Sequence, residues 1–192
     1  MANVDSPFGL KPARHISGAP YNGAFNVYTT ASGDNVAIYV GDPVKLSGTA
    51  QVVNGVTYTD VDQAATGDVV LGVVVGVLPE TDESLKYRAA STVRRLCVAD
   101  DPSLVYEIQE VSGGTALTTA AIGLNANFVV GTGSTVTGLS GVELNNATED
   151  TTNTLDLQIV GIVNRVDNEV GEHAKWLVRN NRPQFSNQIA GI

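Results

Sequence analysis

The chain has 192 residues, of which 43% are hydrophobic and 16% charged, and a formal net charge of −9. This length suits one domain or two small ones, and the acidic charge argues against nucleic acid as the main partner, because phosphate backbones repel such a chain. A single cysteine excludes an intramolecular disulfide and the Cys/His zinc patterns. The N-terminal residues lack the features of a signal peptide, and no apolar run reaches the roughly 20 residues of a transmembrane helix. We therefore expect a chain made in a reducing cytoplasm, with no membrane partner.

Residues 1–32 predict an extended N-terminal arm. Pro7, Pro12 and Pro20 each block a helix and push the preceding residue towards extended conformations. The arm also carries large apolar side chains, each worth about 1.5–3 kcal/mol when fully buried. These side chains are Phe8, Leu10, Ile16, Tyr21, Phe25 and Tyr28. Such a segment is expected to lie along a surface, either of its own chain or of a neighbour.

The rest of the chain predicts short strands and little helix. Asn54-Gly55 between alternating residues indicates a tight β-hairpin, since a type I′ turn needs positive φ at both central positions. The apolar run 69–78 predicts a central strand whose glycines mark bulges. Residues 118–123 predict one helical turn with Thr118 as its N-cap, and 83–91 is the best candidate for a short helix. The fold class expected is all-β, a short-stranded barrel or sandwich.

An internal duplication is indicated by three matches in the same order. Residues 33–48 resemble 123–138, ninety positions later, and 69–78 resemble 155–164. Residues 94–102 resemble 175–183 in the same way. Two copies of a β-unit would each bury part of an apolar face, so they should pack on each other or close a barrel. The expected organisation is an arm at 1–32, a first β-unit at 33–112, a second at 113–185 and a C-terminal tail at 186–192.

No pattern in the sequence predicts catalysis, a cofactor or a metal site. The glycine-rich segment 131–138 lacks the lysine of a phosphate-binding loop, so it is interpreted as a hairpin loop. His15 and His173 have no plausible nucleophile beside them in the sequence, and Cys97 in an apolar strand is expected to be buried and inert. Two acidic pairs lack the ligand spacing of a calcium loop: Asp60 with Asp62, and Asp100 with Asp101.

The two ends of the chain are mildly basic, whereas the body between them is acidic. Lys and Arg are absent between Leu96 and Asn164, whereas Lys11 and Arg14 lie in the arm. Near the other end, alternation in 175–179 gives Trp176 and Val178 one face of a strand, opposite a face with two cations. Trp176 fits a core position, and the charged face is open to contact with a partner, because aromatic and Arg residues anchor interfaces.

Three stretches resemble the head decoration, or cement, proteins of tailed bacteriophages. They are MANVDSPFGLKPARH, the motif GDPVKL followed by VLGVVVGV, and VGIVNRVDNEVGEHAKWLVRNN. The resemblance implies a non-enzymatic β-protein of the virion, made in the host cytoplasm and bound to the outside of the capsid. It also implies the major capsid protein and copies of the same chain as partners, often in a trimer at local three-fold points, and it implies no catalytic residues.

The residues expected to contact the capsid or another partner lie in the arm and in the C-terminal run. They are Pro7, Phe8, Leu10, Lys11, Arg14, Trp176, Arg179, Arg182 and Phe185. The alternative is a β-module of a phage particle that binds carbohydrate or a host surface. Aromatic residues, on which such modules stack sugars, make up only 6% of the chain.

Overall fold

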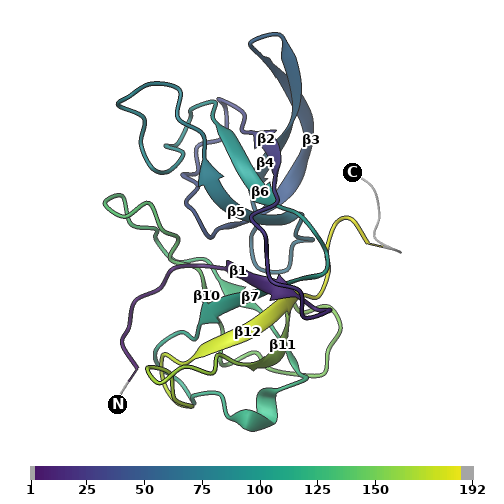
Figure 1. Cartoon of the computed structure of the whole chain (residues 1–192), viewed down its shortest axis with the longest axis vertical. Coiled ribbons are helices and arrows are strands. Elements are labelled where there is room, and N and C mark those ends of the chain that lie inside the picture. Colours follow the sequence, from purple (N-terminus) through teal and green to yellow (C-terminus); the bar gives the residue numbers. More distant parts are fainter. Residues whose placement is uncertain (1–2, 187–192) are drawn as a thin grey trace.

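The computed structural model describes residues 3–186, whose regular structure is almost all β-strand, joined by long loops and arranged as two bodies one above the other in Figure 1. The all-β prediction is confirmed. Within the described residues, no helix is long and apolar enough to cross a membrane. The upper body is a closed barrel in the order β2 (Asn26–Thr29), β4 (Val56–Gln63), β3 (Pro43–Val53), β5 (Gly72–Val77) and β6 (Arg95–Ala99).

The lower body is a five-stranded sheet with a small two-stranded sheet beside it. The large sheet has the order β1 (Lys11–His15), β7 (Leu104–Gln109), β12 (Lys175–Asn180), β11 (Leu157–Ile162) and β8 (Asn125–Ala126). The small sheet pairs β9 (Phe128–Val129) with β10 (Glu143–Leu144). The predicted hairpin loop 131–138 lies between these two antiparallel strands, and a 3-10 helix, η1 (Thr119–Ala121), follows Thr118 as predicted.

Local turn chemistry shapes the barrel as the sequence predicts. Val53 pairs with Val56 across a two-residue turn in which Asn54 and Gly55 have φ of 52° and 79°. This is the geometry of a type I′ hairpin turn. In β5 the register with β6 shifts between Val74 and Gly76, which is the predicted glycine-marked bulge.

The same bulge occurs in the lower body, where the register of β11 with β12 shifts between Ile159 and Gly161. The backbone amide of Gly41 donates to the carbonyl of Val74 at 2.8 Å, and that of Gly123 donates to Ile159 at 2.9 Å. Gly41 and Gly123 also have similar φ, +99° and +95°. Gly123 therefore occupies the place of Gly41 and not of Gly33, so the sequence match of 33–48 with 123–138 is out of register. The duplication itself stays a prediction.

The first 32 residues are built into both bodies. β1 is an edge strand of the lower sheet, and β2 is a strand of the barrel. The barrel strands span residues 26–99, and the remaining strands of the lower body begin at β7, so the division differs from the predicted bounds of 33–112 and 113–185. Residues 187–192 of the predicted tail lie outside the described residues.

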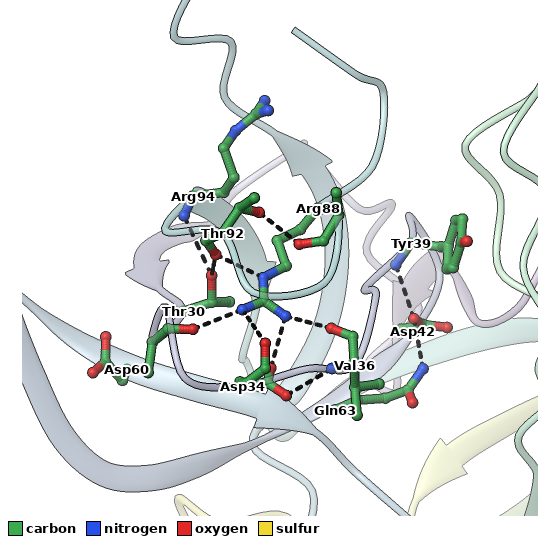
Figure 2. A network of polar contacts seen from close by, with 12 residues as sticks. Thr30, Asp34, Val36, Tyr39, Asp42, Asp60, Gln63, Arg88, Thr92 and Arg94 are labelled. Carbon is green, nitrogen blue, oxygen red and sulfur yellow. Dashed lines mark hydrogen bonds and ion pairs between the residues drawn. The ribbon is translucent and has the colours of Figure 1, made fainter.

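The best candidate for a short helix, 83–91, does not form one, because tertiary contacts hold this segment in a loop. The backbones of Ile38 and Arg88 exchange two hydrogen bonds, at 2.9 and 2.8 Å. The ring of Tyr87 stacks on Tyr39 with centroids 4.8 Å apart. Arg88 is fully buried within a network of polar contacts, shown in Figure 2. These contacts outweigh the weak helix preference of a short segment.

Candidate docking surface

The N-terminal segment lies against its own chain. The amide of Ser6 donates to Oε1 of Gln109 at 3.0 Å, and the amide of Leu10 donates to the carbonyl of Gly41 at 2.9 Å. The first contact is with the lower sheet and the second is with the barrel region, so the segment crosses from one body to the other. In Figure 1, β1 runs between the two bodies. The arm was expected to lie along a surface of its own chain or of a neighbour, and the structure shows it on its own chain.

Strand pairing brings the basic residues of the two ends of the chain onto one face of the lower sheet. Arg14 in β1 and Arg179 in β12 are both opposite Val105 in β7, on its two sides. Directly opposed residues of antiparallel strands point to the same face of a sheet. Lys11 is likewise opposite Glu107. The arm and the C-terminal run, predicted separately as partner contacts, thus form one surface.

Two of these cations form no ion pair in the part of the chain that the structure describes. Within residues 3–186, no carboxylate lies within ion-pair distance of Lys11 or Arg14. The Arg179 Nε atom is buried and has no hydrogen-bond partner among the described residues. Two further cations beside them are partly neutralised, Arg165 by Glu107 at 3.2 Å and Lys175 by Asp167 at 3.6 Å. We call these cations the basic face: Lys11, Arg14, Arg165, Lys175 and Arg179.

A cavity of about 660 Å³ opens beside the basic face, where the barrel and the lower sheet meet. We call it the junction cavity. Phe8 and Leu10 of the N-terminal segment and Val74 and Val75 of β5 contribute to its apolar lining. Lys11, Glu107, Arg165 and Lys175 supply its charged groups. Its volume falls in the range of about 300–1,000 Å³ that is usual for ligand sites, which pair apolar walls with a few polar groups.

The other predicted contact residues divide between surface and interior. Pro7 is exposed, and Phe185 is 53% exposed. Leu10 is only 2% exposed and belongs to a core cluster that includes residues of both bodies, among them Val73 of β5 and Ile108 of β7. The guanidinium of Arg182 donates to the carbonyls of Gly67 and Thr154, at 3.0 and 3.1 Å, so it closes contacts within the chain.

Trp176 is fully buried, so its side chain cannot contact a partner as predicted. Its indole Nε1 donates to Glu110 at 2.9 Å, and Glu110 also accepts the amide of Leu117 at 2.7 Å. Trp176 and Val178 are both buried, whereas the neighbouring residues of β12 are partly exposed, which matches the alternation read from the sequence. The core interpretation of Trp176 is the one that the structure supports.

His15 has a neighbour that the sequence did not reveal. Its Nδ1 atom lies 3.0 Å from the hydroxyl of Ser103 and 3.3 Å from the carboxylate of Asp101. A Ser-His-Asp triad needs the hydroxyl and the carboxylate on different ring nitrogens, and here both contact the same one. Asp101 also accepts the amide of Ser103 at 2.7 Å, so the group caps the turn between β6 and β7.

Sequence reasoning missed the junction cavity because its walls come from segments far apart in the chain, with no local motif. Within the part of the chain that the structure describes, no three His, Cys, Asp or Glu side chains are grouped so as to hold a metal. No protein-family model matches the chain, and neither a curated protein nor a solved structure matches it. The basic face and the junction cavity are therefore the features on which a function is argued.

Proposed function

We propose that the protein is a structural component of a tailed-phage particle that binds the outside of the capsid as a decoration or cement protein. The major capsid protein is its partner, and the trimer implied by the resemblance is its proposed state. The observation that carries this proposal is the basic face. A chain with a net charge of −9 gathers five cations on one side of one sheet, beside an apolar cavity.

This surface suits a partner with exposed carboxylates and an apolar side chain. Lys11 and Arg14 form no ion pair within the described residues, so a partner carboxylate could approach them without displacing one. The apolar lining of the junction cavity would bury the partner's side chain. A protein that binds only the assembled shell stabilises that shell by mass action, and the effect is repeated at every site.

The first prediction tests the basic face with two charge-reversed variants. Lys11→Glu with Arg14→Glu should weaken co-sedimentation with intact, undecorated heads by about tenfold or more, equivalent to about 1.4 kcal/mol. The matched control is Lys86→Glu with Arg95→Glu, which changes the net charge equally but lies in the barrel. We expect the control to bind close to the wild-type level at moderate salt, where distant charges are screened.

The two parts of the proposal fail in different ways. A wild-type chain that does not co-sediment with heads contradicts the decoration function. Wild-type binding that both double variants retain contradicts the basic face as the docking surface. Charge reversal tests the arm more cleanly than its deletion, because deletion would remove β1 and the buried Leu10.

A further inference from the structure

The hairpin formed by β3 and β4 extends beyond the barrel. β5 pairs with β3 only at Pro43 and Val44. The register between β3 and β4 then shifts between Leu46 and Ala50. Past this irregularity the two strands continue as a two-stranded ribbon, residues 50–59, which projects at the top of Figure 1. We call this segment the ribbon.

One face of the ribbon is exposed along its length. Val52 is opposite Thr57 and Ala50 is opposite Thr59, so these four side chains share a face. All four are exposed, and Val52 is 68% exposed. Isolated two-stranded ribbons are marginally stable in water, and an apolar and threonine-rich face of this kind gains from being covered.

The ribbon also lacks the charges that protect strand edges in other proteins. No charged residue occurs between Lys45 and Asp60, in a chain that carries 31 charged side chains of the Lys, Arg, Asp and Glu types. Natural sheets discourage pairing with other chains by placing Lys or other charges on exposed edges. Here the free edge ends only at the Asn54-Gly55 turn and at the register shift before Ala50, so the ribbon remains open to pairing with another strand.

The backbone of β3 is the more accessible of the two edges. Val53 and Val56 flank a two-residue turn and so form a hydrogen-bonded pair, and the pairs alternate from there. The amides and carbonyls of Val52 and Ala50 therefore point away from β4. The opposite edge is shorter, because β2 joins β4 at Asp60.

We propose that the free edge of β3 pairs antiparallel with the same edge of a second copy of this chain. Two identical edges paired in this way are related by a two-fold axis and are complementary by construction. A second copy brings an identical uncharged ribbon, so the pairing places no like charges of residues 50–59 against each other, although both copies are acidic overall. The contact is separate from the basic face and from the three-fold association proposed above.

Cysteine cross-linking of the full chain tests this pairing. The variants Ala50→Cys and Val52→Cys are each oxidised alone, and an equal mixture of the two is oxidised as well. A two-fold axis that passes between residues 50 and 52 places two of these cysteines opposite each other in one of the three samples. The native Cys97 is buried in β6 and should not react. Val136→Cys is the control, because Val136 is 81% exposed in a different loop. We expect one ribbon combination to form covalent dimer about tenfold faster or more than the control.

Two proline substitutions, each added separately to the cysteine variant that cross-links fastest, then test which edge of the ribbon is used. The first substitution is Ala50→Pro, or Val52→Pro where residue 50 carries the cysteine. It removes one outward-pointing amide of β3 and keeps the hydrogen bonds between β3 and β4, so it should abolish the rapid cross-linking. Thr57→Pro makes the same change on the β4 edge and should leave it intact. Cross-linking no faster than the Val136→Cys control overturns the proposal, and so does a block by Thr57→Pro alone. Trp176 fluorescence melts confirm that each variant is folded.

Discussion

At the scale of single residues, Arg88 is the side chain on which the barrel loops depend most. Its guanidinium donates to the carbonyls of Ala31, Asp34, Val36 and Thr92 and to the carboxylate of Asp34 at 2.9 Å. Figure 2 shows three of these partners, Asp34, Val36 and Thr92, around the guanidinium. A planar guanidinium with five donors is suited to a ring of acceptors, and its full burial leaves no water to replace it.

Replacing Arg88 should therefore be costly. Arg88→Met would break the ion pair with Asp34 and leave the Val36 carbonyl without its donor, and it would remove one hydrogen bond from each of the other three carbonyls. We expect a loss of about 3–5 kcal/mol in the free energy of unfolding. Arg88→Lys should also be destabilising, because three donors from one point cannot reach the same acceptors. Urea denaturation followed by the fluorescence of Trp176 measures both. Arg95→Met is the control, since Arg95 pairs with Glu80 near the surface; an equal loss in the control would contradict the role of Arg88.

The importance of Arg88 could not be predicted from the sequence. Its local sequence favours a short helix, and its acceptors lie mainly in residues 31–36, more than fifty positions earlier. Nothing in the spacing of the residues indicates that these two loops meet. The buried Trp176 could be placed, by contrast, because alternation along one strand is a local signal.

At the scale of elements, two glycines of β5 make a matched test of close packing. A Cβ added at Gly72 would lie 2.3 Å from the carbonyl oxygen of Ala99, a backbone atom that cannot move aside easily. A Cβ added at Gly76 would meet its nearest neighbour, Cys97, at 3.7 Å. Neither glycine needs a positive φ, so the two positions differ mainly in the space available.

We predict that Gly72→Ala lowers the free energy of unfolding by about 1–3 kcal/mol or more, through overpacking. Gly76→Ala should be close to neutral, because the added methyl group makes ordinary contacts and β-strand residues tolerate alanine. Thermal unfolding monitored by circular dichroism compares the two variants. Equal melting temperatures would show that β5 and β6 can separate to accept the added atom, against this expectation.

Elements set by local chemistry are the ones that the sequence predicts well. The Asn54-Gly55 turn, the bulge at Gly76 and the turn capped by Thr118 each depend on a few adjacent residues. The pairing of β1 with β7 depends on residues far apart in the chain, and no local pattern specifies it.

At the scale of the whole molecule, buried carboxylates give the stability a defined pH dependence. Burial raises the pKa of Asp42, although hydrogen bonds from Ser140, the Tyr39 amide and Gln63 oppose the rise. Burial also raises the pKa of Glu143 and of Asp156. Between the unfolded and folded pKa values of such a group, the folded chain binds more protons, so the stability rises as the pH falls.

We therefore predict a higher melting temperature at about pH 5 than at about pH 8. Asp101 acts in the opposite sense, because the Ser103 amide lowers its pKa, but its contribution is lost only at lower pH, below the unfolded value of 3.8. Asp42→Asn should reduce the difference between the two conditions, since an amide does not titrate. A melting temperature that falls steadily from about pH 8 to about pH 5 in the wild-type chain would contradict this.

The candidate site was predictable in its parts and not as a whole. The sequence identifies Lys11, Arg14 and Arg179 as basic residues near the two ends of an acidic chain. Their meeting on one face follows from β7 lying between β1 and β12, which only the fold reveals. The junction cavity and the free edge of the ribbon depend in the same way on how separate segments are arranged.

The place of β1 in the lower sheet has a consequence for biosynthesis. All five barrel strands lie between β1 and β7 in the chain, so the barrel can close on the ribosome while the lower sheet is still missing most of its strands. β1 precedes its neighbour β7 by the whole barrel, and β12, the other neighbour of β7, is the last of the described strands. Of the described strands, β1 therefore waits longest for its sheet to be completed, because a strand cannot pair before its neighbour is made.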